Sequence, residues 1–372
     1  MIRNAQSILV VIPQRIGDVV LSTPVFASLR VAAPQAHLAA LVFAGTEGVF
    51  TSNTDIDEVI SVPRNAPLAF EWELLKKNFR RFDIAASLIA GDRPTLYAAL
   101  FSKYSVGVAL TKRKYWMQRA LLNAWLPYDA VSNHMVMAHI KVLQLLDVSA
   151  AGNIAVAWNR EDEIAVRRVI AGAAHNSPYV VVHPCAKFPY KAWTLDGWIE
   201  LCQWLRGRNF HIYMSGGSDP AEAEFIARLL GGMDSTGITN LAGTLTLPRL
   251  SCLLSGASLY VGPDTGVTHI AAGLGTPTVT LFGPSSPVRW GPWPHGVPLS
   301  KPSPWNMRGS QQLNNVMLLQ GQGSCVPCLE EGCERHVNSL SQCLQQLPPS
   351  TVIAAAERLL SEEHRARAHS GV

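Results

Sequence analysis

One candidate catalytic group is a carboxylate that follows the first apolar run of the chain. The run Ser7–Pro13 is short and rich in β-branched residues, as in a central parallel strand, and Gln14–Asp18 follows it directly. Gly17 allows a tight turn, which would place Asp18 at the carboxyl end of the strand, where open parallel sheets bind ligands. A carboxylate there can act as a general base. The alternative is that Asp18 only caps a helix beginning at Val19.

A candidate anion-binding site lies in the segment Val261–His269. A strand is expected to end in this segment and a helix to open at Thr265 or Gly266. The free N–H groups of the first helical turn and the positive end of the helix would then face an anion such as a phosphate. Asp264 and His269 are near enough in sequence to reach the same ligand. The alternative is a capped helix with a histidine in the core.

Two lysines follow another predicted strand and could neutralise a diphosphate leaving group. They are Lys187 and Lys191, in the segment His183–Trp193. Either lysine could instead be a solvated loop charge. Further along, Glu222 and Glu224 follow a glycine-rich turn, and either could reach a ribose diol.

Two basic segments could meet an anionic partner, and a third is interpreted as a solvated face. Arg93 follows a predicted strand, and the run Lys112–Lys114 (Lys112, Arg113, Lys114) precedes Tyr115 and Trp116. Each of these could equally belong to a solvated helix face. The third segment is a predicted basic amphipathic helix over Glu71–Arg81, and its cations are interpreted as a solvated face: Lys76, Lys77, Arg80 and Arg81.

Four of the seven cysteines lie close together in sequence, in a C-x2-C-x4-C-x9-C pattern: Cys325, Cys328, Cys333 and Cys343. Four thiolates can close a tetrahedral metal site, and His336 is a spare candidate ligand. The alternative is a set of reduced structural thiols, and the sequence leaves the choice open. No catalytic metal and no cofactor are expected. An odd number of cysteines in a long chain also argues against a secreted disulfide framework.

Composition excludes several classes of protein. The chain has 372 residues, which suggests two domains, and 48% hydrophobic against 16% charged residues excludes a disordered chain. A net charge of +4 does not point to nucleic acid, but it suits anionic small molecules or an anionic membrane surface. No apolar run reaches the roughly 18 residues of a membrane helix, and none resembles a signal peptide. A cytoplasmic protein is therefore expected.

Strand-like and helix-like segments alternate twice along the chain, which predicts an α/β protein with doubly wound parallel sheets in two domains and a cleft between them. The expected domains are residues 1–170 and 178–348, followed by a C-terminal helix and tail over 349–372, with Ala171–Pro178 as the linker. Within them we expect a helix over Val19–Arg30 and mostly helix over Lys112–Ser149. Pro292–Gln322 is expected to be mostly loop, apart from the short apolar run Val316–Leu319.

Taken together, these motifs resemble glycosyltransferase family 9, the bacterial heptosyltransferases of the lipopolysaccharide inner core. The similar elements are R-x-G-D before the first predicted helix, K-x-W at Lys191–Trp193, D-T-G-x-x-H at Asp264–His269 and F-G-P at Phe282–Pro284. Their order covers nearly the whole chain. Two further segments look most like the heptosyltransferase III branch of that family: Asn240–Gly243 and Arg289–Trp293.

The resemblance implies a glycosyltransferase B-type fold: two Rossmann-like domains, the first taking a lipid-linked acceptor and the second ADP-L-glycero-D-manno-heptose. It implies an inverting transfer without a metal, with Asp18 as the general base. Lys191 would hold the donor phosphate, and the amides of Thr265 and Gly266, with His269 nearby, would hold the diphosphate.

Other residues receive roles from the same resemblance. Asp264 would orient the diphosphate motif or touch the sugar, and Glu222 would bind the ribose. The family often has hydroxyl residues or glycine where this chain has Cys185 and Ala186, so Lys187 would replace a missing phosphate ligand. The basic residues that would meet the phosphates and carboxylates of the acceptor are Arg93, Lys112, Arg113 and Lys114.

The expected partners are therefore ADP-heptose and a lipopolysaccharide core acceptor, with peripheral contact to the inner membrane and no nucleic acid. Another nucleotide sugar or a protein acceptor would suit the same fold. A non-catalytic nucleotide sensor is a third interpretation, and the presence of Asp18 argues against it. The acceptor hydroxyl and the oligomeric state cannot be predicted from these residues.

Overall fold

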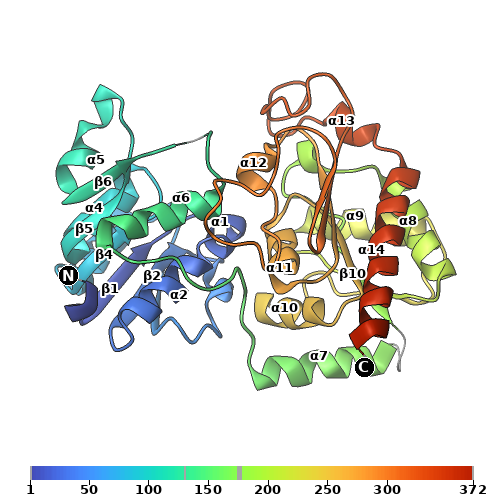
Figure 1. The fold of residues 1–372 in the computed structure, drawn as a ribbon, viewed down its shortest axis with the longest axis horizontal. Helices are drawn as coiled ribbons and strands as arrows, with labels where there is room; N and C mark the ends of the chain where they lie inside the picture. Colours follow the sequence, from blue (N-terminus) through green and yellow to red (C-terminus); the bar gives the residue numbers. More distant parts are fainter. Residues whose placement is uncertain (1, 130, 174–177, 371–372) are drawn as a thin grey trace. The chain divides into compact units, whose positions relative to one another are not determined.

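The computed structural model describes residues 2–129, 131–173 and 178–370 of the chain. It divides into two compact units, each built around its own parallel sheet (Figure 1). Unit 1 comprises Met1–Ala157 and Pro298–Ser303, and unit 2 comprises Trp158–Val297 and Pro304–Val372.

The boundary between the two units lies before helix α7 (Arg160–Ala173), earlier in the chain than the domain boundary predicted from the sequence. That prediction assigned residues up to 170 to the first domain, but α7 packs against α10 (Leu247–Ser255) and belongs to unit 2. The C-terminal helix α14 (Pro349–Ser370) packs against α8 (Leu195–Gly207) and is also part of unit 2. Of the expected linker, residues 174–177 lie outside the described residues.

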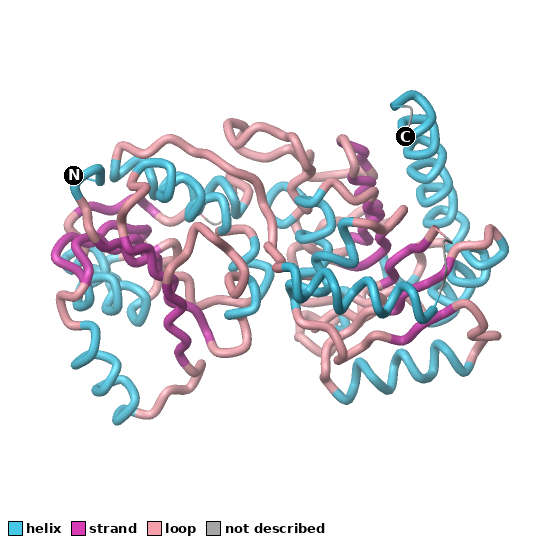
Figure 2. The backbone as a smooth tube through the Cα atoms, turned by 90° about the horizontal axis from the view of Figure 1, so that it is seen from below, coloured by secondary structure: helices cyan, strands magenta, loops and turns pink. Residues whose placement is uncertain are grey.

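The sheet of unit 1 has six parallel strands in the order β3-β2-β1-β4-β5-β6. The strands are β1 Ser7–Val11, β2 His37–Phe43, β3 Glu58–Val62, β4 Phe82–Ser87, β5 Ser102–Ala109 and β6 Ala124–Pro127. The central strands are apolar along their length because both faces of the sheet are covered by helices (Figure 2).

Five helices accompany this sheet: α1 Ile16–Val20, α2 Thr23–Ala32, α3 Leu68–Asn78, α4 Asp92–Phe101 and α5 Trp116–Leu121. Because parallel crossovers are right-handed, α3, α4 and α5 cover one face, while α1 and α2 cover the other. Helix α4 packs against both α3 and α5. A further helix, α6 (Met135–Lys141), packs against α2.

The sheet of unit 2 has seven strands in the order β12-β13-β11-β10-β7-β8-β9, all parallel except that β12 is antiparallel to β13. The strands are β7 Tyr179–Val182, β8 His211–Met214, β9 Ile238–Asn240, β10 Leu259–Pro263, β11 Thr278–Phe282, β12 Gln311–Leu313 and β13 Val316–Gln320. The remaining helices are α9 Pro220–Gly231, α11 Gly266–Leu274, α12 Pro287–Trp290 and α13 Gln342–Gln345. Leaving out β12, this sheet repeats the order of unit 1.

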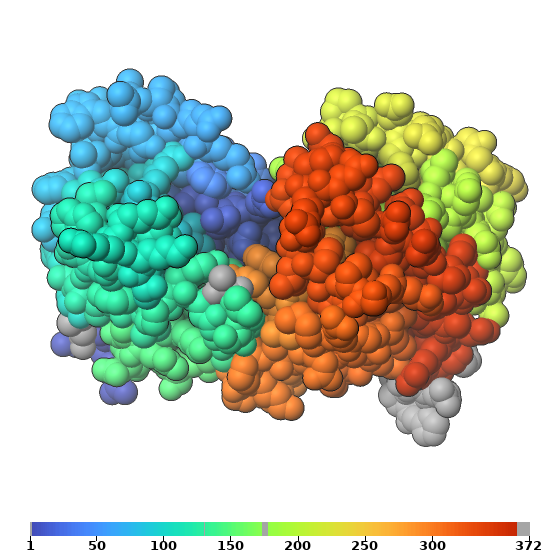
Figure 3. Space-filling model, turned by 90° about the horizontal axis from the view of Figure 1, so that it is seen from above, coloured from blue at the N-terminus to red at the C-terminus, as the bar shows by residue number. Residues whose placement is uncertain are grey.

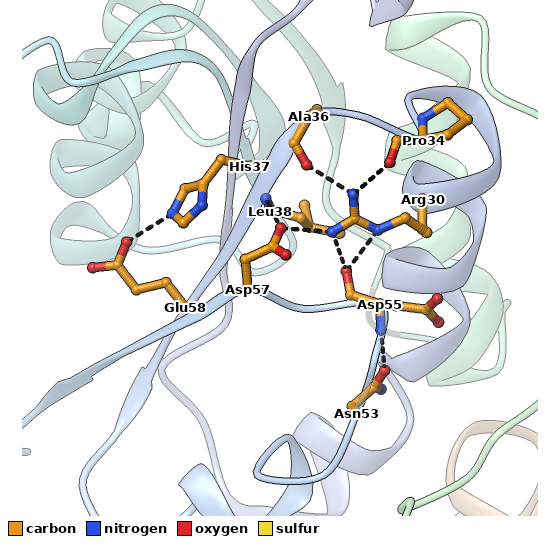
Figure 4. Close-up of polar contacts among 9 residues, drawn as sticks. All are labelled: Arg30, Pro34, Ala36, His37, Leu38, Asn53, Asp55, Asp57 and Glu58. Carbon is orange, nitrogen blue, oxygen red and sulfur yellow. Dashed lines mark hydrogen bonds and ion pairs between the residues drawn. The ribbon is translucent and has the colours of Figure 1, made fainter.

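The guanidinium of Arg30 ties the end of α2 to the start of two strands in unit 1 (Figure 4). It donates to the carbonyl of Asp55 at 2.9 and 3.1 Å and to the carbonyl of Ala36 at 2.8 Å. It also pairs with the carboxylate of Asp57 at 2.6 Å, which in turn accepts the N–H of Leu38 at 2.8 Å. One side chain therefore satisfies several polar groups at the amino edge of the sheet.

Replacing this side chain should destabilise unit 1 without touching the candidate site. Arg30→Ala leaves carbonyls and a carboxylate without their donor, and we expect the free energy of unfolding to fall by about 2–3 kcal/mol. Urea unfolding followed by circular dichroism measures the change. Arg167→Ala removes an exposed ion pair with Glu163, one helical turn away. It should lower the free energy of unfolding by less than about 0.5 kcal/mol. Equal losses in the two variants would contradict the role given to Arg30.

Candidate active site

Both sheets reverse their strand order at one point, which is where open parallel sheets bind ligands. In unit 1 the reversal lies between β1 and β4, and in unit 2 it lies between β7 and β10. The segment containing Asp18 follows β1, the segment containing Lys191 follows β7, and Asp264 follows β10. These three candidates therefore stand at the carboxyl ends of switch-point strands, as their positions in the sequence predicted.

Asp18 lies within a helix rather than in front of one. Helix α1 begins at Ile16, its N-cap residue is Arg15, and no side chain caps it. Asp18 belongs to the first turn and is half-buried. The expected helix over Val19–Arg30 is two helices, α1 and α2, and the interpretation of Asp18 as the cap of a helix beginning at Val19 is wrong.

Lys191 and Asp264 form an ion pair in unit 2. The ammonium nitrogen of Lys191 lies 2.5 Å from the carboxylate of Asp264, and these side chains are 21% and 6% exposed. The backbone brings them together because β7 and β10 are neighbours in the sheet. The interpretation of Lys191 as a solvated loop charge is therefore wrong. The carboxylate fixes the lysine position while leaving the ammonium partly open to solvent.

Helix α11 begins beside this pair, at Gly266, as the sequence predicted. Thr265 is the N-cap residue, but its side chain caps none of the first N–H groups. Its hydroxyl instead lies 3.3 Å from the hydroxyl of Thr268, which donates to the carbonyl of Pro263 at 2.5 Å. The first turn of a helix has no intrahelical acceptors for its N–H groups, so this turn offers donors for an anion.

His269 lies in α11 and is buried, with 4% of its surface exposed. Among the residues that the structure describes, no group pairs with its Nδ1 atom. Burial lowers the pKa of His269 to about 4, while Asp264 raises it and Lys191 lowers it. His183, at the end of β7, is also buried, and burial lowers its pKa to about 4. Both rings are neutral at pH 7, so His269 can serve the site as a neutral donor or acceptor and not as a cation.

These two histidines predict a loss of stability in acid. The unfolded chain binds protons at both rings below pH 6.5, whereas the folded chain does not until about pH 4. Each ring therefore lowers the free energy of unfolding as the pH falls from 6.5 to 4, by up to about 3 kcal/mol. In His269→Gln, the free energy of unfolding measured in urea should depend less steeply on pH than in the wild type. The exposed His336→Gln control should follow the wild type, and parallel curves for all three proteins would contradict the assignment.

Glu222 and Lys187 lie near the same edge of the sheet. The N–H of Gly217 donates to the carboxylate of Glu222 at 2.6 Å, which holds this side chain against the glycine-rich turn after β8. Glu224 is exposed on the same helix, α9, and forms no such bond. Lys187 is exposed in the loop after β7, and within the described ranges it forms no ion pair.

The backbone around Lys191 is held by side chains that no pattern near it in the sequence predicts. The hydroxyl of Ser341 donates to the carbonyl of Tyr190 at 2.7 Å, and the amide of Gln345 donates to the carbonyl of Ala192 at 3.0 Å. These partners are more than 150 residues away in sequence. No local pattern marks them, and only the folded chain brings them beside the lysine.

The candidate acceptor-binding cations of unit 1 have two different environments. The guanidinium of Arg93 pairs with Glu71 at 2.8 Å and donates to Tyr97 at 2.6 Å and to the carbonyls of Pro63 and Arg64 at 2.9 and 2.7 Å. Most of its donors are therefore used within the unit. The run Lys112, Arg113 and Lys114 is exposed instead, around the short helix Arg113–Tyr115.

The segment that contains Cys325, Cys328, Cys333 and Cys343 belongs to unit 2. Burial, together with the neighbouring thiols of Cys328, Cys333 and Cys325, raises the pKa of the Cys343 thiol to about 11. The backbone N–H of Gln342 donates to the sulfur of Cys333 at 3.3 Å. Nowhere in residues 2–129, 131–173 and 178–370 are three or more His, Cys, Asp or Glu side chains arranged to hold a metal ion.

Comparison with known proteins identifies the family and the relatives of this chain. Residues 96–306 match the model of glycosyltransferase family 9 (heptosyltransferase). Lipopolysaccharide heptosyltransferase 3 of Escherichia coli is 24% identical over 357 residues, which cover 92% of this chain and 96% of the relative.

Solved structures of similar proteins share the fold. A glycosyltransferase family 9 protein from Veillonella parvula DSM 2008 matches with a TM-score of 0.77 at 20% identity, over 97% of this chain and 99% of that one. The ADP-heptose lipopolysaccharide heptosyltransferase II of E. coli matches with a TM-score of 0.74 at 20% identity, over 96% and 99%.

Two sheets that share one strand order, each with one switch point, form the B-type fold of glycosyltransferases. The matched residues, more than half of the chain, identify its family: the chain belongs to glycosyltransferase family 9, the heptosyltransferases.

Proposed function

We propose that this enzyme transfers heptose from ADP-L-glycero-D-manno-heptose to the inner core of lipopolysaccharide, inverting the anomeric carbon. The names of its relatives support the substrates, since they include lipopolysaccharide heptosyltransferase 3 and an ADP-heptose enzyme. The observation that carries the proposal is the Lys191–Asp264 pair at the start of α11, at the switch point of unit 2.

The donor site follows from the charge that develops in the reaction. As the glycosyl bond breaks, negative charge grows on the leaving diphosphate, and donors already in place stabilise it. The Lys191 ammonium and the N–H groups of Thr265 and Gly266 are such donors, with neutral His269 beside them. Glu222 would accept hydrogen bonds from the ribose. Lys187, being exposed, is the cation that can turn toward a phosphate without leaving an ion pair.

The acceptor side of the reaction belongs to unit 1. Asp18 would accept the proton of the attacking hydroxyl, on the face of the anomeric carbon opposite the leaving group. Lys112, Arg113 and Lys114 would meet acceptor phosphates and carboxylates, because they are exposed and uncommitted to buried partners. Arg93 is a weaker candidate for the same role, since its guanidinium is held by four groups of its own unit.

The acceptor is lipid-linked, so the enzyme would work at the surface of the inner membrane, on its cytoplasmic side. Across the described residues, no helix has both the length and the apolar character needed to span a bilayer. Peripheral contact is therefore the form of membrane association that we propose.

A panel of acceptors tests the substrates directly. Purified enzyme is incubated with ADP-heptose and with lipopolysaccharides truncated at successive inner-core positions, and products are identified by mass. Addition of one heptose to one truncation only is the expected result, and it also identifies the acceptor step. Transfer from a different nucleotide sugar, or onto none of the truncations, would contradict the proposal.

A further inference from the structure

Helix α3 of unit 1 exposes large apolar side chains that its own packing does not use. Leu68, Trp72 and Phe79 are 88%, 57% and 58% exposed. At about 100° per residue, Leu68 and Trp72 share one side of α3, and Phe79, its C-cap residue, continues the same stripe at the end of the helix. A different side of α3 packs on the sheet, with Leu74 and Asn78 buried. A surface helix normally exposes polar residues to solvent, so an exposed apolar stripe departs from the usual pattern.

A lysine borders the stripe. The ammonium of Lys76 lies 5.5 Å from the centre of the Trp72 ring and also pairs with Glu73 at 2.8 Å. Lys77 is exposed on another side of the helix, and the guanidinium of Arg80 donates to the carbonyls of Ser102 and Lys103 at 3.0 and 3.4 Å. Lys76 is therefore the cation of this segment that lies beside the apolar side chains. The sequence alone suggested an ordinary solvated face here, which does not account for the exposed apolar residues.

Helices α4 and α5, on the same face of the sheet as α3, also expose apolar side chains. On the same face of the sheet, Leu96 of α4 is 37% exposed, and Trp116 and Met117 of α5 are 62% and 43% exposed. The basic run Lys112–Lys114 precedes α5 directly. In Figure 3 the α3 segment, light blue, forms a raised part of the surface of unit 1. Aromatic and aliphatic side chains mixed with lysine and arginine are typical of surfaces that bind the headgroup region of an anionic bilayer.

We propose that the exposed stripe of α3, made of Leu68, Trp72 and Phe79 and bordered by Lys76, binds to an anionic lipid bilayer together with the basic run Lys112–Lys114. The apolar stripe would enter the boundary between headgroups and acyl chains, while the lysines contact lipid phosphates. The inference rests on the proposed function, because a lipid-linked acceptor requires contact with a membrane. It adds the surface that makes the contact, which lies on the helix face of unit 1 and away from the carboxyl edge of its sheet.

Vesicle sedimentation tests the surface. The full chain is mixed with vesicles of phosphatidylcholine alone or with phosphatidylglycerol added, and the bound fraction is measured. We expect binding to the anionic vesicles and at least roughly a tenfold loss in Leu68→Ser/Trp72→Ser/Phe79→Ser. Val31→Ser removes an apolar side chain that is 71% exposed on α2, on the other face of the sheet, and should bind like the wild type. Lys76→Gln should weaken the preference for anionic lipid while keeping the stripe.

Transfer assays separate this inference from the proposed function. With acceptor embedded in anionic vesicles, the triple variant should lose most of its kcat/KM, whereas with delipidated core oligosaccharide it should equal the wild type. Equal vesicle binding by wild type and triple variant would overturn the inference even if transfer is confirmed. Vesicle binding lost in the variant, with no heptose transfer by either protein, would overturn the function and leave the surface in place. A dimer that the triple variant converts to monomer in sedimentation velocity, without any vesicle binding, would assign the stripe to a second copy of the chain and overturn the lipid assignment.

Discussion

Asp18→Asn should lower kcat/KM for heptose transfer by roughly 10²–10⁴-fold, the range typical of losing a general base. The amide keeps the size of the side chain and its place in the first turn of α1, but it cannot accept a proton. Donor affinity should stay within about threefold of the wild type, because the groups that we propose to bind the donor belong to unit 2. Steady-state rates and the binding of ADP, measured by calorimetry, give the two quantities.

Asp55→Asn is the matched control for that variant. Asp55 is an acidic residue of the same unit, but it precedes β3 and lies at the amino edge of the sheet, opposite the edge that carries Asp18. Its carboxylate takes no part in the contacts drawn in Figure 4. Wild-type rates are expected for this variant. Asp18→Asn with wild-type turnover would contradict the assignment of the base, and loss of both turnover and ADP binding would point to a binding role instead.

Lys191→Met should damage both catalysis and stability. The activity should fall by roughly 10²–10³-fold, because a charged donor no longer faces the leaving diphosphate. The Asp264 carboxylate, only 6% exposed, would also be left without its cation. We expect a loss of about 2–3 kcal/mol in the free energy of unfolding, below the range for fully buried pairs because Lys191 keeps some contact with solvent. Turnover and urea unfolding measure the two effects.

A double variant separates the two roles of the lysine. Lys191→Met/Asp264→Asn removes both charges, so stability should recover toward that of the wild type while activity stays low. Lys301→Met, an exposed lysine of unit 1, controls for the general loss of a charge. Recovery of activity in the double variant would mean that Lys191 only balances Asp264 and does not act on the donor.

Apolar runs and turn residues predicted most of the strands because these features are local. The apolar runs His37–Phe43 and Glu58–Val62 predict two strands, and β2 and β3 have these bounds. Asp219 is a typical N-cap residue in front of Pro220, and it caps α9 by accepting from the N–H of Ala221. The same reasoning placed the helix start at Gly266.

Elements with a weak local signal were predicted wrongly or not at all. β5 contains two serines and a lysine among its eight residues and was not predicted. β6 is a four-residue strand ending in Pro127, inside the region from Lys112 that was interpreted as mostly helical. β13 coincides with the apolar run Val316–Leu319, the exception in a segment predicted to be mostly loop, and it pairs with β11 along five residues. Tertiary pairing stabilises such strands, and a window of sequence does not report it.

The candidate site was predictable as a set of loops but not as a set of contacts. Strand ends indicated Asp18, Lys191 and Asp264, because parallel sheets gather such residues at one edge. The pairing of Lys191 with Asp264, the neutral state of His269 and the commitment of Arg93 to its own unit depend on burial and on partners distant in sequence. Spacing along the chain carries no information on these.

The configuration of the new glycosidic bond tests the central claim most directly. ADP-heptose labelled with ¹³C at the anomeric carbon is converted with an inner-core acceptor, and the configuration of donor and product is compared by NMR. Opposite configurations are expected, because a base on one face of the anomeric carbon and a leaving diphosphate on the other require a single displacement. Retained configuration, or release of free heptose without transfer, would contradict an inverting heptosyltransferase with Asp18 as its base.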